Sequence, residues 1–372
     1  GVHGRDEAIA HTNIKLSSTV FPIDWSKDME ATIGALKTLG ASIVRNDKEV
    51  TITGIGKAPK QAKVDCIESG STLRFLIPIA AAKGISCQFI GSGRLPERPL
   101  APYVDAFERK GARLDGKFVP LRLSGQLQPG AFILPGDISS QFITGLLFAL
   151  PLLSKDSTIT LSTPLESAPY VDLTIHVLRE FGVHIFWEKD KFTIPGNQKY
   201  LSRKFQVEGD FSNAAFFLTA AALGNSVKVF SLSQNSLQGD RKILNILSAL
   251  GAAPVQEKEF ITVRQSVSRP TEIDGRDVPD LLPILCVAAA AVPGRTVIRG
   301  TKRLKIKESD RAAAMVDCLS RLGGQIREET DTLIVDGGHP LHGATVPSYG
   351  DHRIVMSMAI AACLVDSPIV ID

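Results

Sequence analysis

Charged side chains are densest in the run KIKESDR, residues 305–311. A spacing of four predicts that Lys307 and Arg311 share one face at the start of a helix, with Glu308 beside them. Two cations and a carboxylate in that arrangement could bind an oxyanion and move a proton. From spacing alone, a solvated and charged helix start is an equally good interpretation.

Two further clusters carry arginine. The loop GSGRLPERPL, residues 91–100, places Arg98 beyond glycines and a proline that indicate a rim or a lid. The string GDHR, residues 350–353, offers His352 and Arg353 where a helix is expected to begin. Arginine binds phosphate or carboxylate through two N–H groups at once. The plain alternatives are an exposed loop and a capped helix start.

A repeated element has to position these clusters. Amphipathic helices that end in glycine and lead into a strand recur about every seventy residues. Their glycines are Gly40, Gly111, Gly182, Gly251 and Gly323. Each glycine falls where a helix end needs a residue that tolerates positive φ.

A second kind of helix recurs at the same period and is apolar all round, which is typical of buried helices. Short polar clusters precede these helices, at residues 68–71, 139–141, 210–213, 277–280 and 350–353. Such clusters cap helices, and the bare N–H groups of a helix start also favour bound anions. Taken singly, each cluster is more simply interpreted as a helix cap than as an anion site. Between the helices, β-branched runs indicate strands.

Length and composition limit the remaining possibilities. The 372 residues predict two domains: residues 17–206 with three repeats and 207–372 with two repeats and an incomplete third, after an unmatched tail at 1–16. The 42 Lys and Arg and 39 Asp and Glu residues are scattered, which argues against nucleic acid. Five separated cysteines without CxxC spacing favour neither disulfides nor zinc and fit the cytoplasm. No apolar stretch reaches the ~18 residues of a membrane span.

The ordered strings become specific when they are taken together. They are ESGSTLR, RLPERPL, SSQF, ESAPYVD, EGDFSNAAFFLTAAAL, DVPD, KIKESDR and GDHRIVMSMA. From about Ser17 to Asp372 the chain resembles the 5-enolpyruvylshikimate-3-phosphate (EPSP) synthases. The resemblance implies an α+β fold with α/β-type repeats, in which two similar domains are built from βαβαββ units of about seventy residues. This is the inside-out α/β prism, with the active site in the cleft between the domains.

The resemblance also implies an activity. Such enzymes transfer the enolpyruvyl group of phosphoenolpyruvate to the 5-hydroxyl of shikimate 3-phosphate through a tetrahedral intermediate and release phosphate, in the shikimate pathway to aromatic amino acids. They use no metal and no organic cofactor. We therefore expect a cytoplasmic monomer whose partners are these two small molecules, without nucleic acid or membrane.

Site residues follow from the resemblance position by position. The contacts implied for shikimate 3-phosphate are Ser139, Ser140, Gln141, Ser167, Tyr170, Asp280 and Lys307. The contacts implied for phosphoenolpyruvate are Gly70, Arg98, Gln141, Arg311 and Arg353. Asp280 and Glu308 resemble the proton-transfer pair, with Asp280 accepting a proton and Glu308 serving the carbon. Lys307 resembles the lysine near the ring hydroxyl, and Gly70 the glycine that borders the inhibitor glyphosate.

The chain departs from the family pattern at several places. The opening GVHGRDEAIAHTNIKLSS does not match the family's Pro-Gly-Ser-Lys-Ser segment, and no Lys-Ser-Phe-Pro-like segment occurs up to Asp372. We therefore expect two lysines of the family site to be missing and activity to be reduced. Ala168 replaces a basic residue, and Arg303 stands where a small amide is often found.

Three alternatives remain open. The first is an impaired or truncated homologue that only binds shikimate 3-phosphate. The second is the sister enolpyruvyl transferase acting on UDP-N-acetylglucosamine, which carries a reactive cysteine in the loop before its Arg-Pro; here that loop has Arg94 and no cysteine. The third, a repeat-type interaction protein, gives no reason for the ordered cationic clusters.

Overall fold

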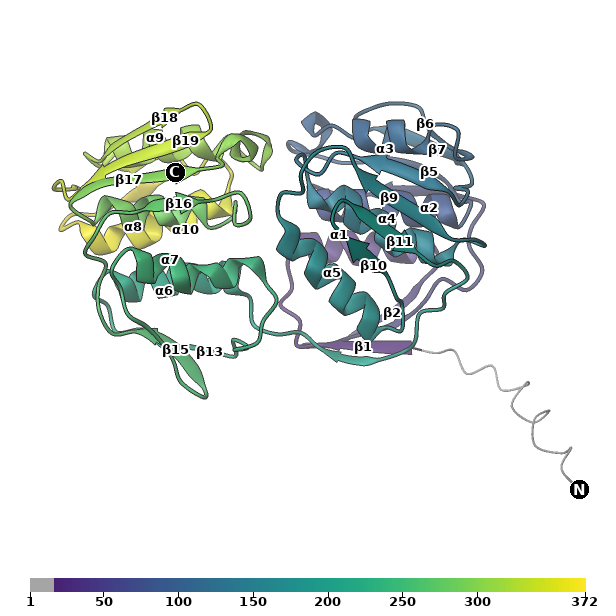
Figure 1. The fold of residues 1–372 in the computed structure, drawn as a ribbon, viewed down its shortest axis with the longest axis horizontal. Coiled ribbons are helices and arrows are strands. Elements are labelled where there is room, and N and C mark those ends of the chain that lie inside the picture. The colour runs from purple at the N-terminus through teal and green to yellow at the C-terminus, as the bar shows by residue number, and fades with distance from the viewer. Residues whose placement is uncertain (1–16) are drawn as a thin grey trace, which may run out of the picture. The chain divides into compact units, whose positions relative to one another are not determined.

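The computed structural model describes residues 17–372 and folds them into two compact units (Figure 1). Unit 1 comprises residues 17–134, 141–162 and 175–207, and unit 2 comprises residues 135–140, 163–174 and 208–372. Two short segments of the first half of the chain thus belong to unit 2. The expectations for residues 1–16 lie outside the described residues.

Unit 1 holds three four-stranded sheets among the described residues, in the orders β12-β1-β3-β2, β4-β5-β7-β6 and β10-β11-β9-β8. Its strands are β1 (Ser17–Phe21), β2 (Ser42–Arg45), β3 (Val50–Thr53), β4 (Gln61–Asp65), β5 (Ser86–Ile90), β6 (Ala112–Leu114), β7 (Leu121–Gly125), β8 (Ala131–Leu134), β9 (Ser157–Leu161), β10 (Phe186–Glu188), β11 (Lys191–Ile194) and β12 (Lys204–Gln206). The helices in this part of the chain are α1 (Lys27–Thr38), α2 (Gly70–Ala82), η1 (Leu95–Glu97), α3 (Ala101–Phe107), α4 (Ser140–Ala149), η2 (Leu150–Leu152) and α5 (Ala168–Glu180).

Unit 2 holds sheets of three, four and two strands among the described residues, in the orders β13-β15-β14, β16-β17-β19-β18 and β20-β21. Its strands are β13 (Val229–Phe230), β14 (Pro254–Gln256), β15 (Phe260–Val263), β16 (Glu272–Asp274), β17 (Gly294–Arg299), β18 (Gln325–Glu329), β19 (Thr332–Gly337), β20 (Thr345–Val346) and β21 (Val370–Ile371). Its helices are α6 (Phe211–Ala222), η3 (Gly239–Lys242), α7 (Ile243–Ala249), α8 (Leu282–Ala290), η4 (Lys302–Ile306), α9 (Arg311–Arg321), α10 (His352–Ala361) and η5 (Ala362–Leu364).

The βαβαββ repeat has one pairing pattern wherever it is complete. In the sheets that start with β4, β8 and β16, the first strand runs parallel to the second, and the second runs antiparallel to the fourth. The third strand then pairs antiparallel with the fourth. Strand β12 pairs in parallel with β1, so it takes the first place in the sheet of β1, β2 and β3.

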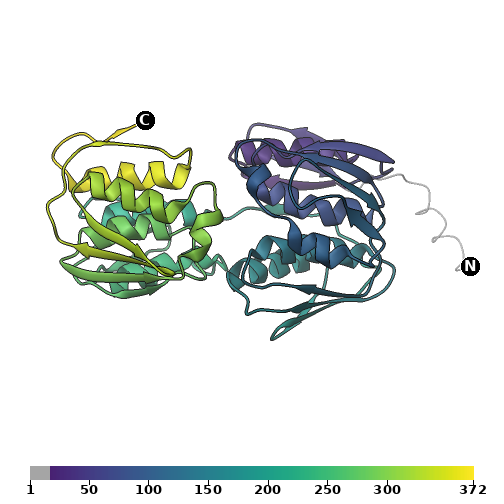
Figure 2. The same cartoon turned by 90° about the horizontal axis from the view of Figure 1, so that it is seen from above.

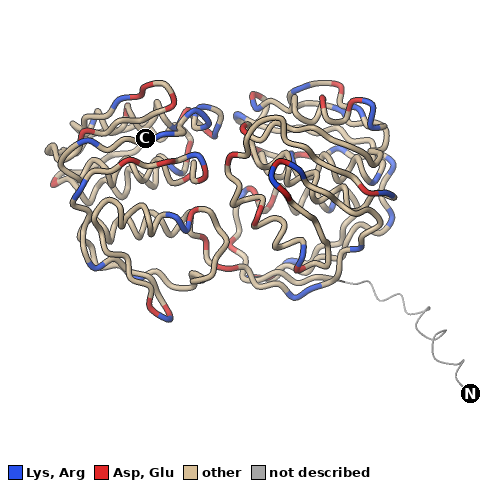
Figure 3. The backbone as a smooth tube through the Cα atoms, viewed as in Figure 1, with Lys and Arg blue, Asp and Glu red and all other residues tan. Residues whose placement is uncertain are grey.

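Helices lie side by side inside each unit, with the strands outside them (Figure 2). The glycine prediction is confirmed, because the glycines that follow α1, α3, α5, α7 and α9 all have φ between +78° and +104°. An L-residue adopts such angles only with strain, so glycine ends each of these helices. The apolar helices alternate with them: α4, α6 and α8 carry no charged residue. Lys, Arg, Asp and Glu residues recur along the chain in both units (Figure 3).

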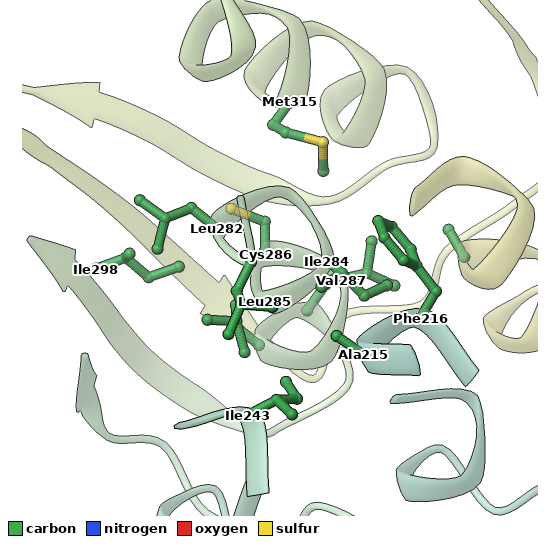
Figure 4. Packing of buried hydrophobic residues seen from close by; sticks show 14 of the residues in the cluster. Ala215, Phe216, Ile243, Leu282, Ile284, Leu285, Cys286, Val287, Ile298 and Met315 are labelled. Carbon is green, nitrogen blue, oxygen red and sulfur yellow. The ribbon is translucent and has the colours of Figure 1, made fainter. Parts of the chain in front are cut away.

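The core of unit 2 surrounds helix α8 (Figure 4). Every residue from Leu282 to Ala290 is buried, and the helix shares one core with Phe216 of α6, Ile298 of β17 and Met315 of α9. Burying a large apolar side chain contributes about 1.5–3 kcal/mol, so this packing holds the starts of the neighbouring helices at defined places. Within residues 17–372, no helix is both long and apolar enough to cross a membrane.

Candidate active site

In unit 1, the start of helix α2 lies against two guanidinium groups. Ser69 caps the helix by accepting a hydrogen bond from the N–H of Thr72 at 3.3 Å. A Cβ atom placed on Gly70 would lie 2.6 Å from Nη1 of Arg98 and 2.9 Å from Nη1 of Arg74. Only glycine leaves room for both arginines in these positions. The predicted pair Gly70 and Arg98 is therefore brought together at a helix start that favours anions.

Arg74 joins this cluster to helix α4. Its Nη1 donates to Oε1 of Gln141 at 2.8 Å, and its guanidinium carbon lies 5.0 Å from the ring centre of Phe142. The hydroxyl of Tyr103 donates to the carbonyl of Arg74 at 2.6 Å. Because Arg74 is only 7% exposed, its charge is held inside the unit beside Gln141. Ser140, the first residue of α4, is buried, and Ser139 precedes it.

In unit 2, Arg311 is the centre of an ion-pair network and is 2% exposed. Its Nε donates to Asp351 at 2.8 Å, its Nη1 to Asp280 at 2.7 Å and its Nη2 to Glu308 at 2.6 Å. Asp351 also caps α10 and accepts from the hydroxyl of Ser309 at 2.9 Å. The starts of α9 and α10 and Asp280, two residues ahead of α8, are thus linked through one guanidinium.

Asp280 receives a second cation, because Nζ of Lys307 lies 3.1 Å from its Oδ1. Burial raises the pKa of Asp280, but the positive charges of Lys307, Arg311 and Arg353 together lower it by more than burial raises it. The carboxyl therefore stays ionised. The prediction that Lys307 and Arg311 share a helical face is wrong. Asp310 caps α9, so the helix begins at Arg311, and Lys307 is the extended residue that ends η4. The two cations meet on Asp280 instead.

Arg353 is 8% exposed and lies between α10 and α6. Its Nη1 donates to the carbonyl of Ser212 at 3.1 Å, and its guanidinium carbon is 5.7 Å from the ring centre of Phe216. Its Nε has no hydrogen-bond partner among the described residues, although it is buried. The neighbouring His352 is more open to solvent, with its side chain 60% exposed. Arg353 thus keeps donor capacity that an anion could use.

Residues 163–174 bring a third set of polar groups into unit 2. Ser167 is 1% exposed and has a φ of +59°, which is strained for a serine. Its hydroxyl accepts a hydrogen bond from Nη1 of Arg303 at 2.8 Å, and Glu166 lies 3.5 Å from the same nitrogen. Burial raises the pKa of the Glu166 carboxyl, and Arg303 opposes that rise.

Tyr170 stands one turn beyond Ser167 and donates its hydroxyl to Oδ2 of Asp240 at 3.2 Å. Burial, followed by the negative charges of Asp240 and Asp280, holds the pKa of Tyr170 well above its usual value, so the phenol remains a donor. The described part of the chain contains no group of three or more His, Cys, Asp or Glu side chains arranged to hold a metal.

Sequence reasoning missed Arg74, Asp240 and Asp351. Their partners lie 67, 70 and 40 residues away along the chain, so no local spacing indicates these contacts. Asp351 carried one signal, because an aspartate directly before a helix is a cap. Its second role, on Arg311, depends on the packing of α9 against α10.

Known proteins resemble this chain over nearly its whole length. The family model described as EPSP synthase (3-phosphoshikimate 1-carboxyvinyltransferase) matches residues 8–372. The 3-phosphoshikimate 1-carboxyvinyltransferase of Clostridium novyi is 43% identical over 95% of this chain and 85% of that protein. Its counterpart in Clostridium acetobutylicum is 44% identical over 95% and 84%. The solved EPSP synthase of Acinetobacter baumannii superposes with a TM-score of 0.78 at 28% identity, over 95% of this chain and 85% of that one.

Proposed function

The chain belongs to the EPSP synthase family, enzymes that transfer the enolpyruvyl group of phosphoenolpyruvate to shikimate 3-phosphate, and from that premise we propose which of its side chains carry out the transfer. The observation that carries the proposal is Asp280, a carboxylate kept ionised between Lys307 and Arg311. The reaction needs such a group, because a hydroxyl must lose a proton beside substrates that carry several negative charges.

Shikimate 3-phosphate binds, in this proposal, to the serines that begin two helices and to their neighbours. The set is Ser139, Ser140, Gln141, Ser167, Tyr170, Asp280 and Lys307. Arg303 joins it, because its side chain is 11% exposed and its guanidinium already donates to the Ser167 hydroxyl. A positive charge beside a hydroxyl suits a phosphate, and Arg303 supplies the charge that Ala168 does not.

Phosphoenolpyruvate binds, in this proposal, to Arg98, Arg311 and Arg353, with Gly70 and Gln141 beside them. The close approach of Arg98 to Gly70 and the unpartnered Nε of Arg353 support the assignment. Arg311 differs from the other two because its three carboxylate partners largely occupy its donors. Arg311 therefore stabilises the structure of unit 2 as well as contributing positive charge to the proposed phosphoenolpyruvate site.

Proton transfer requires the basicity of Asp280 to change when substrates bind. In the free enzyme its lowered pKa makes it a weak base. Substrate anions compete for Lys307 and Arg311, and weakening those contacts raises the basicity of Asp280 where the hydroxyl proton must leave. Glu308 is 39% exposed, so it can exchange a proton with solvent and deliver it to the methylene carbon. The tetrahedral intermediate then loses phosphate.

We further propose that the enzyme works as a monomer in the cytoplasm. All five cysteines are free, and four of them are buried. Burial raises the pKa of Cys66, Cys286 and Cys318 to about 12, which keeps these thiols protonated and slow to oxidise.

The test is phosphate release from phosphoenolpyruvate in the presence of shikimate 3-phosphate, with Lys307→Ala beside Lys305→Ala. Both lysines come from one segment, but Lys305 pairs with Glu328 at 2.8 Å and lies outside the site. Losing the Lys307 contacts should lower kcat/KM by about ten- to a hundredfold, whereas Lys305→Ala should change it less than about twofold. Equal rates in the two variants would overturn the role of Lys307.

Omitting shikimate 3-phosphate separates transfer from simple hydrolysis, since release that continues without it is not transfer. Replacing it with UDP-N-acetylglucosamine tests the sister activity, and no release is expected.

A further inference from the structure

Asp240 is a buried carboxylate for which the transfer reaction described above has no task. It lies in η3, is 3% exposed, and accepts a hydrogen bond from the Tyr170 hydroxyl on Oδ2. No hydrogen-bond partner of normal geometry reaches its buried Oδ1 among the described residues, although the Ser212 hydroxyl faces it. A buried carboxylate with an unsatisfied oxygen destabilises a fold. Its position beside Tyr170, which is proposed to bind substrate, therefore indicates a functional role.

The local packing holds Asp240 against Tyr170. A Cβ atom on the preceding Gly239 would lie 2.9 Å from Cβ of Pro169, so η3 approaches the start of α5 more closely than any other residue type would permit. Pro169 is the residue before Tyr170. The contact between the carboxylate and the phenol is therefore fixed by backbone packing as well as by the hydrogen bond.

The charged groups that face Asp240 come from the other elements packed around it. Burial, followed by the charge of Asp280, raises the pKa of Asp240 to about 6, while Ser212 of α6, Arg353 of α10 and Tyr170 of α5 lower it. Helix α7 follows η3 and contributes no charged residue. Asp240 thus changes charge near pH 6. It does so close to Tyr170, assigned to shikimate 3-phosphate, and Arg353, assigned to phosphoenolpyruvate.

We propose that Asp240 is a positioning residue that orients the Tyr170 hydroxyl for shikimate 3-phosphate, and that it does so as a carboxylate. The proposal rests on the proposed role of Tyr170 in binding this substrate. An ionised carboxylate accepts a shorter and stronger hydrogen bond than a neutral acid. When Asp240 is protonated, the phenol is held less firmly, and binding of shikimate 3-phosphate weakens.

The experiment compares the wild type with Asp240→Asn, which keeps the shape and removes the charge. The KM for shikimate 3-phosphate should rise by about tenfold at pH 8, while the KM for phosphoenolpyruvate changes less than about twofold. Substrate phosphates also titrate near pH 6, so the quantity to follow is the ratio of the wild-type kcat/KM to the variant value at each pH. That ratio should fall toward one between pH 7 and pH 5. Asp336 is the half-buried partner of Arg295, and changing it to Asn should give a ratio that does not depend on pH.

Tyr170→Phe separates the two levels of the proposal. If this variant leaves the KM for shikimate 3-phosphate unchanged, the role of Tyr170 is wrong. If its KM rises but Asp240→Asn still has its full effect in the Tyr170→Phe background, or the wild-type to Asp240→Asn ratio is flat with pH, the positioning role of Asp240 is overturned. Should Asp240→Asn not fold, the ratio of shikimate 3-phosphate affinities of the wild type and Tyr170→Phe, followed from pH 5 to pH 8, reports the same titration. A flat ratio there overturns the proposal too.

Discussion

The cationic side chains of unit 2 are of two kinds: some stabilise the fold, and others remain available to bind substrate. Arg311 has three carboxylate partners and almost no exposure, so removing it would leave Asp351 buried without its ion-pair partner and Asp280 with Lys307 alone. Breaking one buried pair in this way costs about 3–5 kcal/mol of stability. Lys307 has one partner and is 22% exposed, so it can be exchanged without unfolding the unit. Loss of activity at Lys307 is therefore easier to interpret than loss at Arg311.

Arg303 provides the first prediction at this scale. Changing Arg303 to Ala removes the donor on Ser167 and a cation from the proposed phosphate site. The KM for shikimate 3-phosphate should rise by about ten- to a hundredfold, since a hydrogen bond to a charged group contributes about 1.5–3 kcal/mol. Arg303→Asn, which restores an amide donor, should raise this KM by less than Arg303→Ala does. Arg299→Ala is the control, because Arg299 is 59% exposed and pairs with Glu272. Indistinguishable kinetics for Arg303→Ala and Arg299→Ala would contradict the assignment.

Gly70 provides the second prediction. The Cβ of Gly70→Ala would meet the ends of two flexible arginine side chains, not backbone, so the fold should survive while Arg98 is displaced. We expect the KM for phosphoenolpyruvate to rise by about tenfold. Gly34→Ala in α1 is the matched control, since its Cβ meets nothing within 4 Å. That change should stabilise the protein by about 0.5–1 kcal/mol and leave both KM values unchanged. A thermal unfolding scan with steady-state kinetics reads both effects, and a normal KM in Gly70→Ala would count against the site.

At the scale of elements, helix starts carry the site, and they do so in two ways. Asp210 and Asp351 are both N-caps, accepting hydrogen bonds from the second residue of α6 and of α10. Asp351 also holds Arg311, whereas Asp210 has no ion-pair partner among the described residues. Helix α8 has no side-chain cap, because its N-cap residue is Leu281; Asp280, one residue earlier, accepts hydrogen bonds from Lys307 and Arg311. A polar residue near a helix start can thus serve the helix, as Asp210 does, the site, as Asp280 does, or both, as Asp351 does.

The two caps should differ in what they contribute to stability. Asp210→Ala should cost about 0.5–2 kcal/mol, the usual value of a cap. Asp351→Ala removes a cap and also leaves Arg311 with less counter-charge, so it should cost about 3–5 kcal/mol or more. Midpoints of urea unfolding measure both. Similar losses in the two variants would mean that the Asp351 to Arg311 pair contributes nothing beyond capping.

Periodicity predicted the elements well, and it predicted the contacts between them poorly. The glycine of each repeat gives the helix ends, and apolar composition gives the buried helices, because both properties are local. A spacing of four does not show that Lys307 and Arg311 lie on different elements, because the cap at Asp310 starts helix α9 only at Arg311. The string QGDRK, residues 238–242, gives no local sign that Asp240 is buried, since the tight packing of Gly239 on Pro169 brings it to Tyr170. Sites assembled from several repeats are visible in sequence only through family resemblance.

For the whole molecule, the pH dependence of stability should have contributions of opposite sign. Asp336 has its pKa lowered, chiefly by hydrogen bonds from Arg295, so its contribution is complete above about pH 4 and is lost at lower pH. Asp240 has its pKa raised to about 6, so the folded protein binds its proton more tightly than the unfolded chain. Its contribution is therefore greatest below about pH 4 and is lost as the pH rises through about 6.

A comparison of variants isolates this effect. Between pH 5 and pH 8 the stability of Asp240→Asn should increase relative to the wild type by between about 1 and 2 kcal/mol. Asp336→Asn should show a constant difference over the same range. Urea midpoints at four pH values suffice, and parallel curves for the wild type and Asp240→Asn would refute the raised pKa.

The pairing of β1 with β12 also affects the order in which a nascent chain can fold. Arg203 donates its N–H to Ser18 across 185 residues, and β1 otherwise pairs only with β3 among the described residues. At ribosomal rates of about 5–20 residues per second, one side of β1 waits roughly ten to forty seconds for its partner. An unpaired strand edge of that kind can capture other chains. Slower translation should therefore lower the yield of folded protein, and a chaperone that covers exposed edges during synthesis should restore it.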